Sequence, residues 1–369
     1  MEERYIACMV LHALGDTIGF KNGEWEFNYQ DPTRELIHIS LEITNEILYE
    51  FISLGGINHL DVKGWKISDD TIMHIETAKS LLESFNSMNK LGKILKKNYL
   101  SVVKILLEDK GLVRLPGETL IQGLERLDYG GNWDDMEYNF YAGGSGASMR
   151  SSVIGLAFHG ENNRDKLIQV AIESSRITHN STTGYLGGLV SALFTAYAIE
   201  NKPVEKWGFL LMEMFDNGVV ENYIKKSERG YEDYKRDSTV FINKWKIYLE
   251  DKFDPSGHVI ERKSSRNIVW RGKYYMEKFS NNKSFIGSGG DDSVIISYDC
   301  LIDAGNSWEK LVIYSMMHIG DTDTTGCISG SWWGAKNGFM DVPKINYKNL
   351  ESKDELISLG KKLYNKYGK

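Results

Sequence analysis

Two short clusters of carboxylate and hydroxyl residues are the parts of this sequence best suited to chemistry. The first is Ser68-Asp69-Asp70-Thr71, and the second is Asp321-Thr322-Asp323-Thr324-Thr325, between two glycines. Each stands directly before a segment with the apolar spacing of a helix, where one Ser or Asp is an ordinary cap for free N–H groups. Capping does not explain two carboxylates in each cluster, because like charges so close together repel one another.

Oxygen atoms are the only ligands that the two clusters offer, since neither contains Cys or His. Hard ligands of this kind suit Mg²⁺, Mn²⁺ or Ca²⁺ rather than Zn²⁺. Because 251 positions separate Asp70 from Asp321, a joint site requires the fold to bring two helix N-termini together. We therefore predict a shared metal site, with the alternative that each cluster only caps its own helix.

Two other acidic motifs do not fit the second cluster. A calcium-binding EF-hand loop that began at Asp321 would need Asp or Asn at its fifth position and Glu at its twelfth, where this chain has Thr325 and Trp332. The D-x-D-x-T pattern of haloacid-dehalogenase phosphatases stands near the N-terminus of those domains. Here only 43 residues follow Gly326, so we set both alternatives aside.

The composition is that of a globular protein. The chain has 369 residues, 41% hydrophobic and 26% charged, with a net charge of −7, which excludes a disordered chain and argues against nucleic acid as a partner. Its three cysteines, Cys8, Cys300 and Cys327, are far apart and form neither a disulfide framework nor a metal knuckle. We therefore expect a reducing compartment.

No segment resembles a signal peptide or a membrane span. The first residues, MEERYIACMV, are acidic where a signal peptide is basic. The most apolar stretch, 184–199, is shorter than the roughly 20 residues that cross a bilayer, so we expect a buried core helix there. The sequence predicts a soluble cytoplasmic protein without a membrane partner. No large apolar patch marks the periodic helices, which favours a monomer.

Helical periodicity dominates the chain, and five prolines leave room for long helices. Strand alternation is scarce, and an isolated candidate at 257–261 does not build a sheet. The predicted class is all-α, with many helices packed irregularly. The helical patterns cover 5–14, 72–82, 90–107, 148–158, 165–177, 183–200, 204–215, 292–304, 307–318, 325–338 and 354–366.

The segment 217–290 differs from the rest because it is rich in Lys, Tyr, Trp, Asn and Ser and contains the block KKSERGYEDYKRD. We interpret it as a solvated helical hairpin with a variable loop. The strongest motifs lie on both sides of it, so it is a poor domain boundary. We predict a single domain over residues 1–369.

Five motifs in order give the sequence a specific resemblance. It resembles the ADP-ribosylglycohydrolase family, and most closely its ADP-ribosylarginine hydrolase branch. The resemblance spans nearly the whole chain. The motifs are GDTIGFKNGEWEF at 15–27, SDDTIMHIETA at 68–78, GGSGASMR at 143–150, RITHNSTTGYLGGLVSALFTAYA at 176–198 and IGDTDTTG at 319–326.

This resemblance implies an orthogonal multi-helix bundle with a binuclear metal cleft that holds two Mg²⁺ ions, with Mn²⁺ as a possible replacement. It implies hydrolysis of the N-glycosidic bond between ADP-ribose and a modified side chain. Mono-ADP-ribosylated proteins are then the partners and ADP-ribose is the product. Carried over by motif, the metal ligands are Ser68, Asp69, Asp70, Asp321, Asp323 and Thr324; Ser68 stands where many relatives have Thr and keeps the hydroxyl.

The resemblance also assigns the catalytic and substrate-binding residues. Glu26 matches the catalytic glutamate of the arginine branch, and its aromatic neighbours are compatible with a partly desolvated acid–base group; the alternative is a surface glutamate. The turn Gly143-Gly144-Ser145-Gly146-Ala147 opens a helix and can present N–H groups to a diphosphate. Tyr141 and His179 are implied as ADP-ribose contacts, although Tyr141 also suits plain core packing.

One stretch departs from the family pattern. At 281–291 the chain reads NNKSFIGSGGD, which keeps Gly287, Gly289 and Gly290 while the preceding residues differ. The resemblance therefore does not determine which residues contact the adenosine or which substrate the protein prefers. The alternatives to an ADP-ribosylarginine hydrolase are an enzyme for ADP-ribosylserine or O-acetyl-ADP-ribose, and a non-catalytic ADP-ribose-binding or structural member of the family. The presence of all six ligands and Glu26 favours an active hydrolase.

Overall fold

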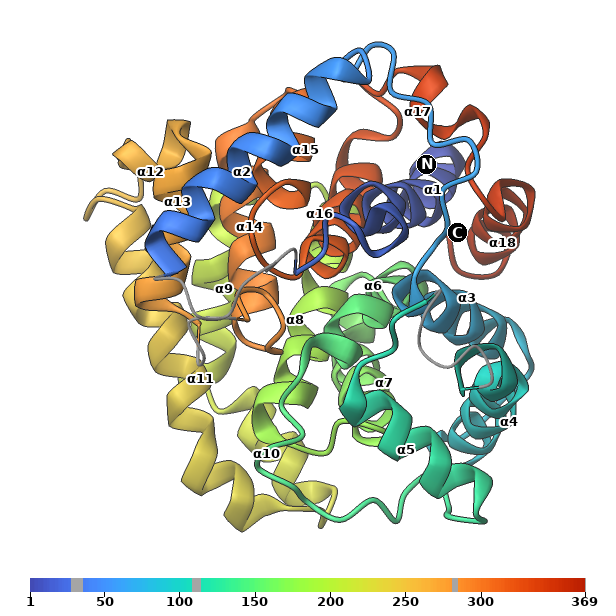
Figure 1. Ribbon diagram of the computed structural model, residues 1–369. Coiled ribbons are helices and arrows are strands. Elements are labelled where there is room, and N and C mark those ends of the chain that lie inside the picture. The colour runs from blue at the N-terminus through green and yellow to red at the C-terminus, as the bar shows by residue number, and fades with distance from the viewer. Residues whose placement is uncertain (28–35, 108–113, 281–284, 369) are drawn as a thin grey trace.

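Helices make up the whole regular structure of the described part of the chain (Figure 1). The structure is a computed structural model, and it describes residues 1–27, 36–107, 114–280 and 285–368. The all-α prediction is confirmed: these residues contain no strand, and the candidate at 257–261 contributes only an isolated bridge between Phe253 and Val259.

The bounds of the helices follow the predicted periodicity closely. Outside 217–290, three helices were not predicted, namely α2, α5 and α17, although Leu120, Leu124 and Leu127 give α5 a clear buried stripe. The α-helices are α1 (Glu2–Phe20), α2 (Leu36–Ser53), α3 (Asp69–Leu82), α4 (Met88–Leu107), α5 (Glu118–Asp128), α6 (Ser148–Ala157), α7 (Arg164–Arg176), α8 (Thr182–Ile199), α9 (Trp207–Asp216), α10 (Val219–Lys226), α11 (Tyr231–Lys252), α12 (Lys263–Arg266), α13 (Ile268–Lys278), α14 (Asp292–Ala304), α15 (Trp308–Met316), α16 (Thr322–Asn337), α17 (Lys344–Lys348) and α18 (Lys353–Tyr367).

Helix α8 forms the centre of the core. By length and composition α8 can cross a membrane, but 94% of its apolar window is buried inside the protein, as predicted for a core helix. Its Phe194 ring lies 5.1–5.5 Å from the rings of four aromatic residues on other helices, measured between centroids. These four are Trp207, Trp245, Tyr298 and Trp332.

Helices α1 and α16 make the most extensive helix pair, although they come from opposite ends of the chain (Figure 1). Glycines on both helices allow this close approach. A Cβ atom on Gly15 or Gly19 of α1 would lie 2.1 Å from a carbonyl oxygen of α16, and one on Gly330 would lie 2.2 Å from the Leu11 oxygen. The pair aligns the end of α1 with the start of α16, where the second acidic cluster stands.

The interpretation of 217–290 as a solvated hairpin is wrong for the inner face of α11. Phe241, Trp245 and Tyr248 are fully buried, because α11 packs against α8 and α9. The charged block around the turn between α10 and α11 and the residues 255–267 are largely solvated. Lys252 and Arg271 are buried as well, and both pair with Asp299.

Candidate active site

The first acidic cluster forms the N-terminus of α3. Ser68 caps the helix, since its Oγ accepts a hydrogen bond from the Asp70 amide at 3.1 Å. Asp69 and Asp70 occupy the first turn, where the helix dipole favours negative charge, and both are buried. The capping interpretation is therefore correct for Ser68, but it leaves the two aspartates unexplained.

The second cluster forms the N-terminus of α16 in the same way. Asp321 caps the helix by accepting from the Thr324 amide at 3.3 Å, and Asp323 accepts from the same amide at 2.9 Å. The two clusters meet at Cys327 of α16, whose Sγ lies 3.4 Å from Asp70 Oδ2 of α3. The structure thus brings together the two helix N-termini that the sequence places far apart.

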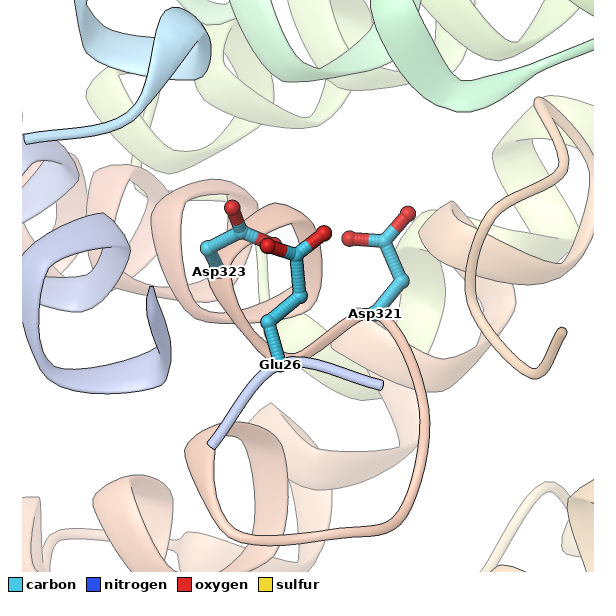
Figure 2. A group of neighbouring side chains, drawn as sticks. All are labelled: Glu26, Asp321 and Asp323. Atoms are coloured by element: carbon cyan, nitrogen blue, oxygen red, sulfur yellow. The ribbon is translucent and has the colours of Figure 1, made fainter. Parts of the chain in front are cut away.

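Glu26 joins the second cluster from the segment that follows α1. One oxygen each from Glu26, Asp321 and Asp323 lie within 4.8 Å of one another, and Figure 2 shows the three side chains converging. The Phe27 amide donates to the Gly320 carbonyl at 3.1 Å, which ties the Glu26 segment to the loop before α16. This contact places Glu26 beside the predicted metal ligands.

Neighbouring Glu24 occupies a different environment. Its side chain is 64% exposed and pairs with Lys21 at 2.5 Å, so Glu26 is the glutamate that enters the cluster. Trp25 turns inward between them and is 1% exposed. Its Nε1–H donates to Glu50 of α2 at 2.9 Å. This hydrogen bond anchors the short segment that carries Glu26.

The carboxyl groups strongly affect one another's ionisation. Burial, followed by the charges of Asp323, Asp321, Asp70 and Asp69, raises the pKa of Glu26 well above its usual range. Burial raises the pKa of Asp321 to about 7, and the charge of Asp70 adds to this effect. The pKa values of Asp69, Asp70 and Asp323 are raised well above normal for the same reasons. So many buried carboxyl groups require protons or cations near neutral pH.

The donor atoms fit a hard divalent cation. Within the described residues no partner donates to Glu26 Oε2, although this oxygen is buried. The threonine and serine hydroxyls beside the carboxylates complete an all-oxygen set of the type that Mg²⁺ and Mn²⁺ accept. Ser145 adds a further hydroxyl, which donates to Asp321 Oδ2 at 3.3 Å.

Asp16 holds the first cluster in place through hydrogen bonds, and sequence reasoning did not single it out. It is fully buried on α1 and accepts hydrogen bonds from the Ser68 and Thr71 amides at 3.1 Å and from the Thr71 hydroxyl. Burial raises its pKa to about 6. The signal lay within the quoted motif GDTIG, but only the fold shows that Asp16 faces the start of α3.

The glycine-rich turn at 143–147 is paired with a second glycine-rich segment. The Ser145 amide donates to the Ser288 carbonyl at 2.7 Å, and the Gly290 amide donates to the Gly143 carbonyl at 2.8 Å. Gly144 and Gly289 form an antiparallel bridge. The prediction that this turn offers its N–H groups to an anion is therefore wrong for Ser145, whose amide is already occupied.

Asp292 holds the second glycine segment in place, and it was also missed. Its carboxylate accepts from the Gly287 amide at 3.0 Å and from the Gly289 amide at 2.8 Å. Gly287 has φ +85°, a conformation that favours glycine. The departing stretch 281–291 is thus partly defined here, whereas 281–284 lie outside the described residues.

The two remaining predicted contacts differ in exposure. Tyr141 is 88% exposed, and its ring meets that of Phe140 edge-on at 5.5 Å between ring centroids, which rules out the core-packing alternative. His179 is 2% exposed. It lies against the glycine-rich turn, since a Cβ on Gly146 would stand 2.5 Å from its Cε1. The fold therefore places both residues next to the turn.

Comparisons with known proteins identify the family. The chain matches the ADP-ribosylglycohydrolase family over residues 1–369. It is 37% identical over 359 residues to L444 of Acanthamoeba polyphaga mimivirus, a protein named as an ADP-ribosyl glycohydrolase, covering 94% of this chain and 67% of that one. It is 36% identical over 387 residues to ADP-ribosylhydrolase ARH1 of Dictyostelium discoideum, covering 99% and 94%.

A solved structure shares the fold. The chain of an ADP-ribosylglycohydrolase-related protein complex aligns over 99% of this chain and 98% of its own, with a TM-score of 0.58 and 17% identity. The family match and the Dictyostelium relative define this all-α protein as an ADP-ribosyl hydrolase. The chain belongs to the ADP-ribosylglycohydrolase family and fits its ADP-ribosylarginine hydrolase branch.

Proposed function

We propose that this protein removes ADP-ribose from mono-ADP-ribosylated arginine side chains. The observation that carries the proposal is the buried convergence of Glu26 with Asp321 and Asp323, within 4.8 Å, in a chain of this family. The Dictyostelium ARH1 protein, which is 36% identical over 99% of this chain, and the NGEWEF segment that contains Glu26 support the arginine linkage.

We further propose that the acidic clusters hold two Mg²⁺ ions, or Mn²⁺ in their place. The ligands would be Ser68, Asp69, Asp70, Asp321, Asp323 and Thr324. When bound, such ions would orient the ribose hydroxyls and a water molecule, and they would lower the pKa of that water. The charge balance of the site supports this, because so many buried carboxylates are not stable together without cations.

Glu26 is the proton-transfer group in this proposal. Burial and neighbouring carboxylates raise the pKa of Glu26, which favours its protonated form. A protonated Glu26 can protonate the departing guanidine as oxocarbenium character develops at the anomeric carbon. After the guanidine leaves, the Glu26 carboxylate can accept a proton from the attacking water.

The glycine-rich turn binds the part of the substrate that does not react. Its remaining amides and the N-terminus of α6 favour the negative diphosphate, and exposed Tyr141 offers a ring to the nucleoside. His179 lies against the turn at Gly146. Binding energy from these contacts holds the scissile bond beside Glu26.

The cellular setting is also part of the proposal. Mono-ADP-ribosylated proteins are the partners and ADP-ribose is the product, with no nucleic-acid or membrane partner. We propose that the protein acts in the cytoplasm as a monomer. The net charge of −7 supports the absence of a nucleic-acid partner, because binding to phosphate backbones needs a basic surface.

The test is ADP-ribose release from matched peptides that carry ADP-ribosyl-arginine or ADP-ribosyl-serine, with Mg²⁺ and with EDTA. We expect release from the arginine peptide alone, and only with Mg²⁺. Release from the serine peptide instead would overturn the arginine linkage but not the family chemistry. Binding of ADP-ribose without release from either peptide would identify a non-catalytic member.

A further inference from the structure

A buried arginine connects two substrate-binding segments. Arg150 of α6 is 1% exposed. Its Nη1 donates to the Gly146 carbonyl at 2.6 Å, and its Nη2 donates to Thr178 Oγ1 at 2.8 Å and to the Ser174 carbonyl at 3.1 Å. One guanidinium therefore holds both the glycine-rich turn and the residue before His179.

The next contact continues from Thr178 to the histidine ring. Thr178 Oγ1 lies 2.8 Å from His179 Nδ1. A threonine hydroxyl has one hydrogen to donate, whereas a guanidinium can only donate. Since Arg150 already donates to Thr178 Oγ1, the hydroxyl hydrogen is directed to His179 Nδ1, which then acts as the acceptor.

The opposite tautomer of His179, with the proton on Nδ1, leaves a buried donor without a partner. If Nδ1 carried the proton and donated to Thr178, the Thr178 hydroxyl hydrogen would have no acceptor among the described residues, and Thr178 is 1% exposed. An unsatisfied buried hydroxyl costs about 1–3 kcal/mol. The first arrangement satisfies both the Thr178 hydroxyl and His179 Nδ1.

The other ring nitrogen of His179 is directed at the binding turn. A Cβ on Gly146 would stand 2.7 Å from His179 Nε2, and one on Gly144 would stand 3.6 Å from it. Within the described residues Nε2 has no hydrogen-bond partner, although the histidine is 2% exposed. Burial and the charge of Arg150 lower the pKa of His179 well below normal, so the ring is neutral.

We infer that Arg150, Thr178 and His179 form a hydrogen-bond relay that fixes His179 in its Nε2–H form and presents this N–H as a donor to an oxygen of bound ADP-ribose. The identity of the ligand rests on the proposed function, whereas the tautomer does not. Arg150 and Thr178 are positioning residues in this relay. His179 is the residue that contacts the ligand, and it transfers no proton.

The test compares Thr178→Val, which has a similar shape but no hydroxyl, with Thr178→Ser, which keeps the hydroxyl. Thr195→Val is the matched control, because Thr195 is equally buried and its hydroxyl donates only to the Ser191 carbonyl of its own helix, at 2.9 Å. The readouts are the His179 tautomer, from ¹⁵N chemical shifts assigned with His179→Gln, and the Kd for ADP-ribose.

We expect the Nε2–H tautomer in the wild-type protein without ligand, in Thr178→Ser and in Thr195→Val, and a mixture of tautomers in Thr178→Val. The Kd for ADP-ribose should rise roughly threefold to tenfold in Thr178→Val alone, as for the loss of one hydrogen bond. This combination of results would support the relay.

Three results would overturn the inference. An Nδ1–H tautomer in the wild-type protein would contradict the direction of the relay. An unchanged tautomer and Kd in Thr178→Val would show that Thr178 positions nothing. Equal weakening in Thr178→Val and Thr195→Val would indicate a general packing effect. Failure of the wild-type protein to bind ADP-ribose would instead refute the proposed ligand, while the tautomer would still be measured without it.

Discussion

The close approach of α1 to α16 makes Gly19 a sensitive position for catalysis. A Cβ on Gly19 would stand 2.1 Å from the Thr322 oxygen and 2.6 Å from the Asp323 nitrogen, whereas ordinary contact begins at 3.4 Å. Relief of this clash in Gly19→Ala requires the end of α1 and the start of α16 to separate by about 1 Å. Asp323 lies at the start of α16, and Glu26 lies in the segment that follows α1.

The size of the effect follows from that displacement. Overpacking of this kind costs about 1–3 kcal/mol, and alanine returns about 1 kcal/mol over glycine within a helix, so the net loss of stability is roughly 0–2 kcal/mol. Misplacement of catalytic groups by about 1 Å costs on the order of 100-fold in rate. We expect Gly19→Ala to lose far more activity than stability.

Gly334→Ala is the matched control for this variant. A Cβ on Gly334 would stand 2.4 Å from the Ala7 carbonyl in the same helix pair, so the cost in stability is similar. The clash lies about 18 Å further along α16, at a rise of about 1.5 Å per residue, and should leave the acidic cluster in place. We expect Gly334→Ala to retain near-normal turnover.

The assay pairs urea denaturation with kcat/KM for an ADP-ribosyl-arginine peptide, at a temperature where circular dichroism shows both variants folded. The reasoning is refuted if folded Gly19→Ala keeps activity within about threefold of the wild type, well short of the loss expected for a 1 Å shift. Equal losses of activity in the two variants would also refute it, because the effect would then reflect the helix pair as a whole.

Three further predictions address the site directly. Glu26→Gln should lower kcat by about 10²–10⁴-fold with little change in the Kd for ADP-ribose; unchanged turnover would remove Glu26 from the mechanism. The rise in Tm on adding Mg²⁺ should be larger near about pH 8 than near about pH 5.5. The pKa of Asp321 is raised to about 7, so without metal the protein loses stability as the pH rises through this value and the carboxyl group ionises; bound Mg²⁺ restores that stability. An equal rise in Tm at both pH values would contradict cation binding by these carboxylates. Asp292→Ala should lower the free energy of unfolding by about 1–3 kcal/mol, since two glycine amides lose their charged acceptor. It should also weaken ADP-ribose binding; a Kd equal to that of the wild type would show that this segment does not contribute to substrate binding.

Most of the helices could be predicted because their signals are local. The apolar repeat of α8 and the caps before α3 and α16 are visible within a few residues, and they fix where these helices begin. The pairing of the two acidic clusters could be predicted only as a requirement of charge balance. The contacts that satisfy it, such as Cys327 Sγ with Asp70 Oδ2 at 3.4 Å, depend on the fold.

The supporting residues could not be predicted because their partners are remote and lie mostly on the backbone. Asp16 accepts from amides more than fifty positions away, and Glu50 holds Trp25 from another helix. Arg150 lies within a recognised motif, but nothing in its spacing indicates the Gly146 carbonyl or the Thr178 hydroxyl as partners. Side chains that bind distant backbone atoms leave no periodic pattern in the sequence.

The pairing of α1 with α16 also has a consequence for biosynthesis. Nearly every residue of α1 from Tyr5 to Phe20 is buried, but 302 positions separate Phe20 from the start of α16 at Thr322. At a translation rate of about 5–20 residues per second, the emerging α1 waits roughly 15–60 seconds for its partner. During this interval its apolar surface depends on chaperones or on temporary contacts, so the nascent chain is exposed to aggregation until the active site can form.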